Sequence, residues 1–172
     1  MQEIIQTLVW QLEWQYKMMR PVLNDISKEI AQWKPSPQAR TLKVIKEWSQ
    51  KGNEWLSKQN FDPVSTIEYK IIHLAQCKQM YENYAFGSKS LKWSDLECPE
   101  WPSAFEYFSQ THVKLLENIQ SINDDKLEEL SLTHFDEKWS FKHIITVLIY
   151  HDAYHFGQIC TMKNYHQYIK SH

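Results

Sequence analysis

The sequence predicts an all-α protein, a four-helix bundle with short helical insertions. Apolar residues recur three and four positions apart over long stretches of the 172-residue chain, which is the spacing of one helix face. The chain has only 3 glycines, too few for the many tight turns of a sandwich or barrel. No run alternates well enough to predict a sheet. We therefore expect residues 1–172 to form a single helical domain.

Two helical stretches are expected in the N-terminal third, with a short helix at 28–33 between them. The first carries apolar residues at Ile5, Leu8, Val9, Leu12, Tyr16, Met19 and Leu23. Pro21 should kink or end this helix, because proline has no backbone N–H to donate. The second runs over 41–58, and Gly52 is expected to weaken its middle because glycine is a poor helix former.

Three more long helices are expected over about 66–87, 103–122 and 140–168. A break at Asp62-Pro63 precedes the first of them. Ser103 and Glu106 have the spacing of a capping box, in which each side chain satisfies a free N–H at the start of the helix. With the helix at the N-terminus, these stretches complete the bundle of four long helices.

Composition and charge argue against several classes of partner. The formal charge is −2 and no basic stripe is visible, so we expect no nucleic-acid partner. The longest apolar run, 144–150, is far shorter than the ~20 residues of a membrane span, and we read no signal peptide. Cys77, Cys98 and Cys160 are an odd number with no short paired spacing, which favours a reduced, cytoplasmic protein.

The histidines of the C-terminal helix are the best candidates for a functional site. His151 and His155 are four residues apart, so they differ by only about 40° around the helix. They share a face with Ile144, Val147, Leu148, Ile159 and Met162, which should point into the bundle. Two such imidazoles can bind one metal ion or form a hydrogen-bonded pair in the core. His73 also lies on an inward face and is the best third ligand.

Cys77 follows His73 by four residues, so a thiolate at this position could reach the same site. The more common role of a free cysteine is that of a small core residue. His112 lies beside the apolar face of its helix and could also be interior, whereas His166 is expected to be solvated.

Two segments carry a resemblance to a known family. The segment His151-x-x-x-His155-x-Gly157-Gln158-Ile159 resembles the C-terminal signature of the DinB-like family, also called DinB/YfiT-like. Ser65-Thr66-Ile67 leading to His73-Leu74-Ala75 is similar to the motif that supplies that family's first metal ligand. The resemblance covers most of the chain from residue 63 on. It implies a four-helix bundle, often dimeric, in which His73, His151 and His155 hold a divalent metal, zinc or nickel, with iron or manganese as further candidates.

A second alignment with the family places a different residue at the position of the first metal ligand. Pro35-Ser36-Pro37 and the helix from Thr41 to Trp48 also resemble the lead-in to the first histidine. On that alignment Trp48 would take the ligand position and the site would be broken. We prefer His73 because it is the right residue type, and the helix over 41–58 is then an insertion.

The resemblance also implies a reaction. Three histidines leave one coordination position open, as in catalytic metal sites. Characterised members of the fold include transferases that add a low-molecular-weight thiol, such as bacillithiol, mycothiol or glutathione, to an electrophile. The expected function is therefore metal-dependent thiol transfer in a homodimer. The expected partners are a small-molecule thiol and an electrophile, and no nucleophile comes from the protein.

Two alternatives stay open: a hydrolase that uses metal-bound hydroxide, and a non-catalytic metal-binding module of a stress response. His151-Asp152-x-x-His155 echoes the layout of zinc proteases, with Asp152 in place of the catalytic glutamate. Because aspartate is one methylene shorter, we expect Asp152 to face solvent or to support a ligand. Gln158, one turn after His155, could contact a bound water or substrate.

Overall fold

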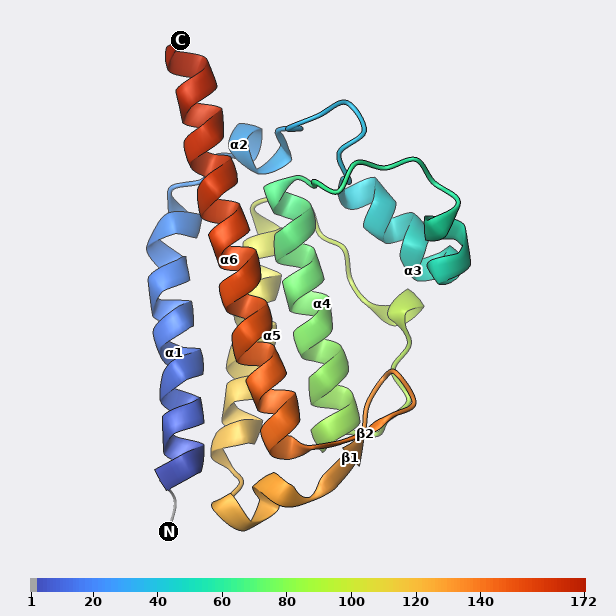
Figure 1. Cartoon of the computed structure of the whole chain (residues 1–172), viewed down its shortest axis with the longest axis vertical. Coiled ribbons are helices and arrows are strands. Elements are labelled where there is room, and N and C mark those ends of the chain that lie inside the picture. The colour runs from blue at the N-terminus through green and yellow to red at the C-terminus, as the bar shows by residue number, and fades with distance from the viewer. Residues whose placement is uncertain (1–2) are drawn as a thin grey trace.

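The computed structural model describes residues 3–172 and is built mainly of helices (Figure 1). The helices are α1 (Glu3–Asn24), α2 (Lys28–Gln32), α3 (Leu42–Ser57), α4 (Ile67–Phe86), α5 (Ser103–Gln120) and α6 (Phe141–Ser171). Short 3-10 turns span Trp93–Asp95 and Asp124–Glu128, and two strands, β1 (Leu130–Leu132) and β2 (Lys138–Ser140), pair antiparallel. The expected all-α fold is confirmed. No helix within residues 3–172 is long and apolar enough to cross a membrane.

The bundle consists of α1, α4, α5 and α6. Each helix contacts two or more of the others, and Figure 1 shows the four running side by side, with α3 outside the bundle and in contact with α4. Helix α4 is central: Ile71, Ile72, Leu74 and Ala75 occupy successive positions around it and are all fully buried. A polar side chain on α4 therefore lies in the interior wherever it points, and must find a partner there.

Side-chain caps mark the start of both helices that carry the candidate histidines. The hydroxyl of Thr66 accepts a hydrogen bond from the N–H of Tyr69 (3.1 Å), and the hydroxyl of Ser140 accepts one from the N–H of His143 (3.2 Å). The expected capping box at Ser103 is wrong, because α5 already begins at that residue and the residue before it makes no side-chain cap.

Two further details differ from the expectations. The β1–β2 hairpin was not predicted because each of its strands has only three residues, too few to show an alternating pattern. Pro21 lies inside α1, which continues to Asn24. The missing N–H removes one hydrogen bond near the helix end, while the burial of Met19 and Leu23 holds the last turn in place.

Backbone hydrogen bonds join the two ends of the insertion that carries α3. The N–H of Arg40 donates to the carbonyl of Val64 (3.0 Å), and the N–H of Thr66 donates to the carbonyl of Arg40 (2.9 Å). The chain thus leaves the bundle and returns to it at one point, directly before α4. Within α3, Gly52 adopts φ 76° and interrupts the helix, as expected from its position.

His112 lies in the core of the bundle, on α5, and is only 2% exposed. Its ring stacks on Tyr16 at 4.2 Å, and neither ring nitrogen has a hydrogen-bond partner within residues 3–172. We expect His112→Phe to raise the free energy of unfolding by about 1–2 kcal/mol, because it removes two buried polar atoms and keeps the stacked ring. Urea unfolding measures the change, with the exposed His143→Phe as control. A loss of stability in His112→Phe would contradict the prediction.

Candidate metal centre

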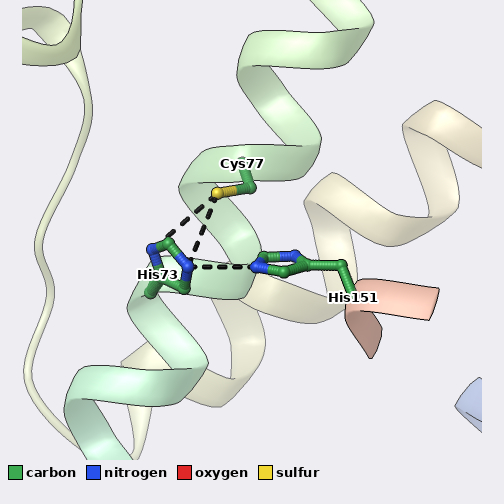
Figure 2. Close-up of side chains that lie close together, drawn as sticks. All are labelled: His73, Cys77 and His151. Atoms are coloured by element: carbon green, nitrogen blue, oxygen red, sulfur yellow. Dashed lines mark hydrogen bonds between the residues drawn. The ribbon is translucent and has the colours of Figure 1, made fainter. Parts of the chain in front are cut away.

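Three histidine rings converge between α4 and α6. His73 comes from α4, and His151 and His155 come from α6. The Nε2 atom of His151 lies 3.1 Å from Nε2 of His73 and 3.1 Å from Nε2 of His155. The ring centroids are 4.6–5.0 Å apart, and each pair of rings is close to perpendicular. Figure 2 shows the edge of the His73 ring facing that of His151.

Hydrogen bonding alone does not satisfy this cluster. A ring nitrogen presents either one N–H or one lone pair in its plane, yet Nε2 of His151 has two equally close neighbours. A cation that accepts all three lone pairs removes the conflict. Two nitrogens bound to one ion at ~2.1 Å are about 3.0–3.4 Å apart in octahedral or tetrahedral geometry, so the observed spacing fits a shared metal ion.

The protonation state of the rings also suits a metal. Burial, together with its two histidine neighbours, lowers the pKa of His73 to about 3. Burial lowers the pKa of His151 and of His155 to about 4. All three rings are therefore neutral at pH 7, which is the form that binds metal ions.

A chain of two hydrogen bonds fixes the tautomer of His155. The side-chain oxygen of Gln158 lies 2.9 Å from Nδ1 of His155 and accepts a hydrogen bond from Nζ of Lys70 (2.8 Å). Because that oxygen only accepts, Nδ1 carries the proton and Nε2 keeps its lone pair for a metal. Gln158 therefore orients a candidate ligand.

Cys77 lies beside the cluster. Its sulfur is 3.8 Å from Nδ1 and 3.9 Å from Nε2 of His73, and His73, Cys77 and His151 each offer a ligand atom within 4.8 Å of the others (Figure 2). Burial raises the pKa of the thiol to about 12, so without a metal it stays protonated. Because the sulfur is about equally far from both ring nitrogens of His73, it does not point specifically at Nε2, the nitrogen that faces His151.

Asp152 is buried, so the expectation that it might face solvent is wrong. Its carboxylate accepts a hydrogen bond from Nζ of Lys78 on α4 (2.6 Å), and both side chains are 1% exposed. The pair joins α4 to α6 one residue away from His151. Asp152 therefore ties together the two helices that carry the histidines. His166, expected to be solvated, is also buried.

Trp48 takes no part in the cluster. Its ring packs against Trp93 at 4.8 Å, and its N–H donates to the side-chain oxygen of Asn53 (2.8 Å), within the α3 insertion that Figure 1 shows outside the four bundle helices. The alignment that places a ligand at Trp48 is therefore not supported, and His73 is the residue that faces His151.

Lys70 is a further residue of the site that was not expected from the sequence. Its position three residues before His73 places it on the same side of α4, and this spacing was the available signal. Burial and, to a smaller extent, the nearby charge of Arg40 lower its pKa to about 8, so it is still mainly cationic at pH 7.

Comparison with known proteins places the chain in a family. The model of the DinB superfamily matches residues 11–159, a span that includes His73, His151 and His155. No match was found among curated proteins. The matched span is well over half of the chain, and its helices form the bundle that carries the histidine cluster. The chain therefore belongs to the DinB superfamily.

Proposed function

We propose that this protein transfers a low-molecular-weight thiol to an electrophile with the help of a divalent metal held by His73, His151 and His155. The observation that carries the proposal is the convergence of three neutral imidazoles on one point from two helices. Three such ligands leave a coordination position for a substrate, whereas structural zinc sites are closed by four protein ligands.

The metal, when bound, supplies a low pKa for a coordinated thiol, so that the thiolate forms at neutral pH. The thiol gives up its proton to the medium, and its sulfur forms a new bond to carbon of the electrophile. The leaving group departs with the electron pair of the bond that breaks. If the thiol instead adds across a double bond of the electrophile, no group leaves. The electron pair of that double bond then takes up a proton and forms a C–H bond.

The protein's own residues hold the site. Gln158 and Lys70 keep the His155 ring in one orientation and one tautomer. The Lys78–Asp152 pair holds α4 against α6. The reaction needs no nucleophile from the protein, and Cys77, which lies beside the cluster, has no role in it.

The first test is metal content. We expect about one divalent ion per chain, zinc or nickel, in protein analysed by elemental mass spectrometry. His73→Ala, His151→Ala and His155→Ala should each reduce it at least tenfold, since a three-ligand site loses a third of its donors. His143→Ala, an exposed histidine on α6, is the matched control. Equal metal content in all four variants would refute the three-histidine site.

The variant Cys77→Ser tests whether the metal has three protein ligands and a free coordination position, or four protein ligands. If the three histidines form the site, this variant keeps its metal and its activity. Loss of the metal in Cys77→Ser would make Cys77 a fourth ligand, close the coordination sphere and contradict the proposed catalytic role.

The reaction is tested with a panel of small thiols and a chromogenic electrophile. We expect conjugation above the rate of the EDTA-treated protein, lost in His151→Ala. Hydrolysis of an activated ester without added thiol would instead favour a hydrolase. Metal binding without either activity would favour a non-catalytic module.

We also propose that the protein is a cytoplasmic homodimer. Trp10 and Trp14 stack on one another on α1 and are 58% and 47% exposed, so they are not core residues, and large exposed aromatic side chains are typical of subunit interfaces. Light scattering should give twice the mass of the chain, and Trp10→Glu should give the mass of a monomer. A monomeric unsubstituted protein would refute the dimer.

A further inference from the structure

A cavity of about 380 Å³ lies against the supports of the histidine cluster. It is bounded by the segment before α4 and by one face of α6, and its lining includes Ser65, Lys70, Tyr154, Gly157, Gln158 and Met162. Two of these residues, Lys70 and Gln158, are those that hold the His155 ring. The cavity is therefore connected to the candidate metal centre through the side chains that support His155.

Lys70 brings a positive charge with unused donors to this cavity. The residue is 6% exposed, and within residues 3–172 its ammonium donates to Gln158 alone, so two of its three N–H groups are free. No carboxylate of residues 3–172 lies within 4 Å of it. Of the residues that line the cavity, Lys70 is the one with a charge. A buried cation without an anion is costly, and a bound anion would stabilise it.

Arg40 adds a second positive charge nearby. Its Nε atom is buried and has no hydrogen-bond partner within residues 3–172. Its backbone pairs with Val64 and Thr66, the neighbours of the cavity residue Ser65, and its charge is close enough to lower the pKa of Lys70. The charge of Arg40 therefore adds to the positive potential around Lys70.

Gly157 keeps the cavity open. It lies inside α6, where glycine costs about 0.5–1 kcal/mol relative to alanine. A Cβ atom added there would meet nothing within 4 Å, so packing against the protein does not require glycine. The missing side chain leaves space on the cavity wall, next to Gln158.

We propose that this cavity binds the carboxylate of an anionic thiol substrate, with Lys70 as its partner, the charge of Arg40 strengthening the attraction, and the thiol directed toward the three histidines. The inference rests on the proposed function and names its substrate class: small thiols that carry a carboxylate. Hydroxyl groups of Ser65 and Tyr154 and the side chain of Met162 line the rest of the space, which suits a small amphipathic molecule.

The test compares two probes, N-acetylcysteine and N-acetylcysteamine, which differ by the carboxylate. Binding to the cobalt-loaded protein is followed by thiolate-to-metal absorption. N-acetylcysteine should bind about tenfold tighter, the effect of one charge-assisted hydrogen bond. Lys70→Met should bring the ratio of the two dissociation constants close to one and Arg40→Met should reduce it, while Lys114→Met, a surface lysine on α5, leaves it unchanged. Equal binding of both thiols to the unsubstituted protein would overturn the proposal.

A second pair of probes, which lack a thiol, tests the carboxylate site independently of the proposed reaction. Calorimetry with N-acetylalanine and N-acetylalaninamide measures carboxylate binding without any contact between sulfur and metal. A preference for N-acetylalanine that is lost in Lys70→Met and in Gly157→Leu supports the carboxylate site even if no thiol conjugation is found. No preference would refute the site even in an active transferase. Metal content is measured in every variant, so that loss of the cluster is not mistaken for loss of the anion site.

Discussion

Replacing Lys78 with methionine should lower the free energy of unfolding by about 3–5 kcal/mol, measured by urea denaturation at pH 8. Lys78 and Asp152 are both 1% exposed and hydrogen-bonded at 2.6 Å. Removing the ammonium leaves the Asp152 carboxylate buried without a counter-charge, and its second oxygen already has no partner within residues 3–172. Few single substitutions in this chain should be more damaging.

The double variant Lys78→Met/Asp152→Leu is the matched control. Because it removes both charges, it should recover most of the loss. In the single variant the loss should shrink as the pH falls from 8 to 5. Burial raises the pKa of Asp152, so the neutral carboxyl is available at low pH, and stability is lost as the pH rises through that pKa. A single variant within 1 kcal/mol of the unsubstituted protein would show that water reaches the pair.

Acidification should destabilise the metal-free protein strongly between pH 6.5 and 4. Burial lowers the pKa of His73 to about 3, of His112 to about 2, and of His151 and His155 to about 4. Below pH 6.5 the unfolded chain takes up protons that the folded chain does not, so stability falls with falling pH. Each fully desolvated histidine contributes up to about 1.4 kcal/mol per pH unit in this window, and the partly exposed His151 and His155 contribute less.

Urea unfolding in EDTA at pH 8, 6.5 and 5 measures this dependence. His112→Phe should flatten the curve by up to about 2 kcal/mol between pH 6.5 and 5, because it removes a fully buried titratable ring. His143→Phe, which replaces an exposed ring, should leave the curve unchanged. A curve that is flat from pH 8 to 5 in the unsubstituted protein would show that the histidines can be protonated in the folded state.

Local patterns predicted the elements of the fold well. The apolar spacing of α1 anticipated its buried residues, with Ile5, Leu12, Met19 and Leu23 all in the core. The breaks before α4 and at Gly87 were expected, because prolines, hydroxyl caps and glycine act on the backbone within a few residues. The expected capping box at Ser103 failed because the same residues form the first turn of α5 itself.

The three histidines that meet in the structure were singled out from the sequence, although their surroundings were not. The spacing of His151 and His155 along one helix is a local property, and the resemblance to the DinB-like family singled out His73. The burial of Asp152 was not foreseen, since it depends on Lys78, which lies 74 residues earlier in the chain. The sequence also leaves open whether Trp10 and Trp14 are buried, because a helix pattern does not tell which neighbour covers each face.

By itself, the sequence determined the helices, the pair of histidines on one helix face and the family to which the chain is similar. Those properties depend on residues a few positions apart, where helix geometry sets the distances. Only the tertiary structure decided that His73 rather than Trp48 meets His151 across 78 residues of sequence, and that Lys70 reaches Gln158 behind them. Contacts between distant segments follow from the packing of whole helices, which no local spacing specifies.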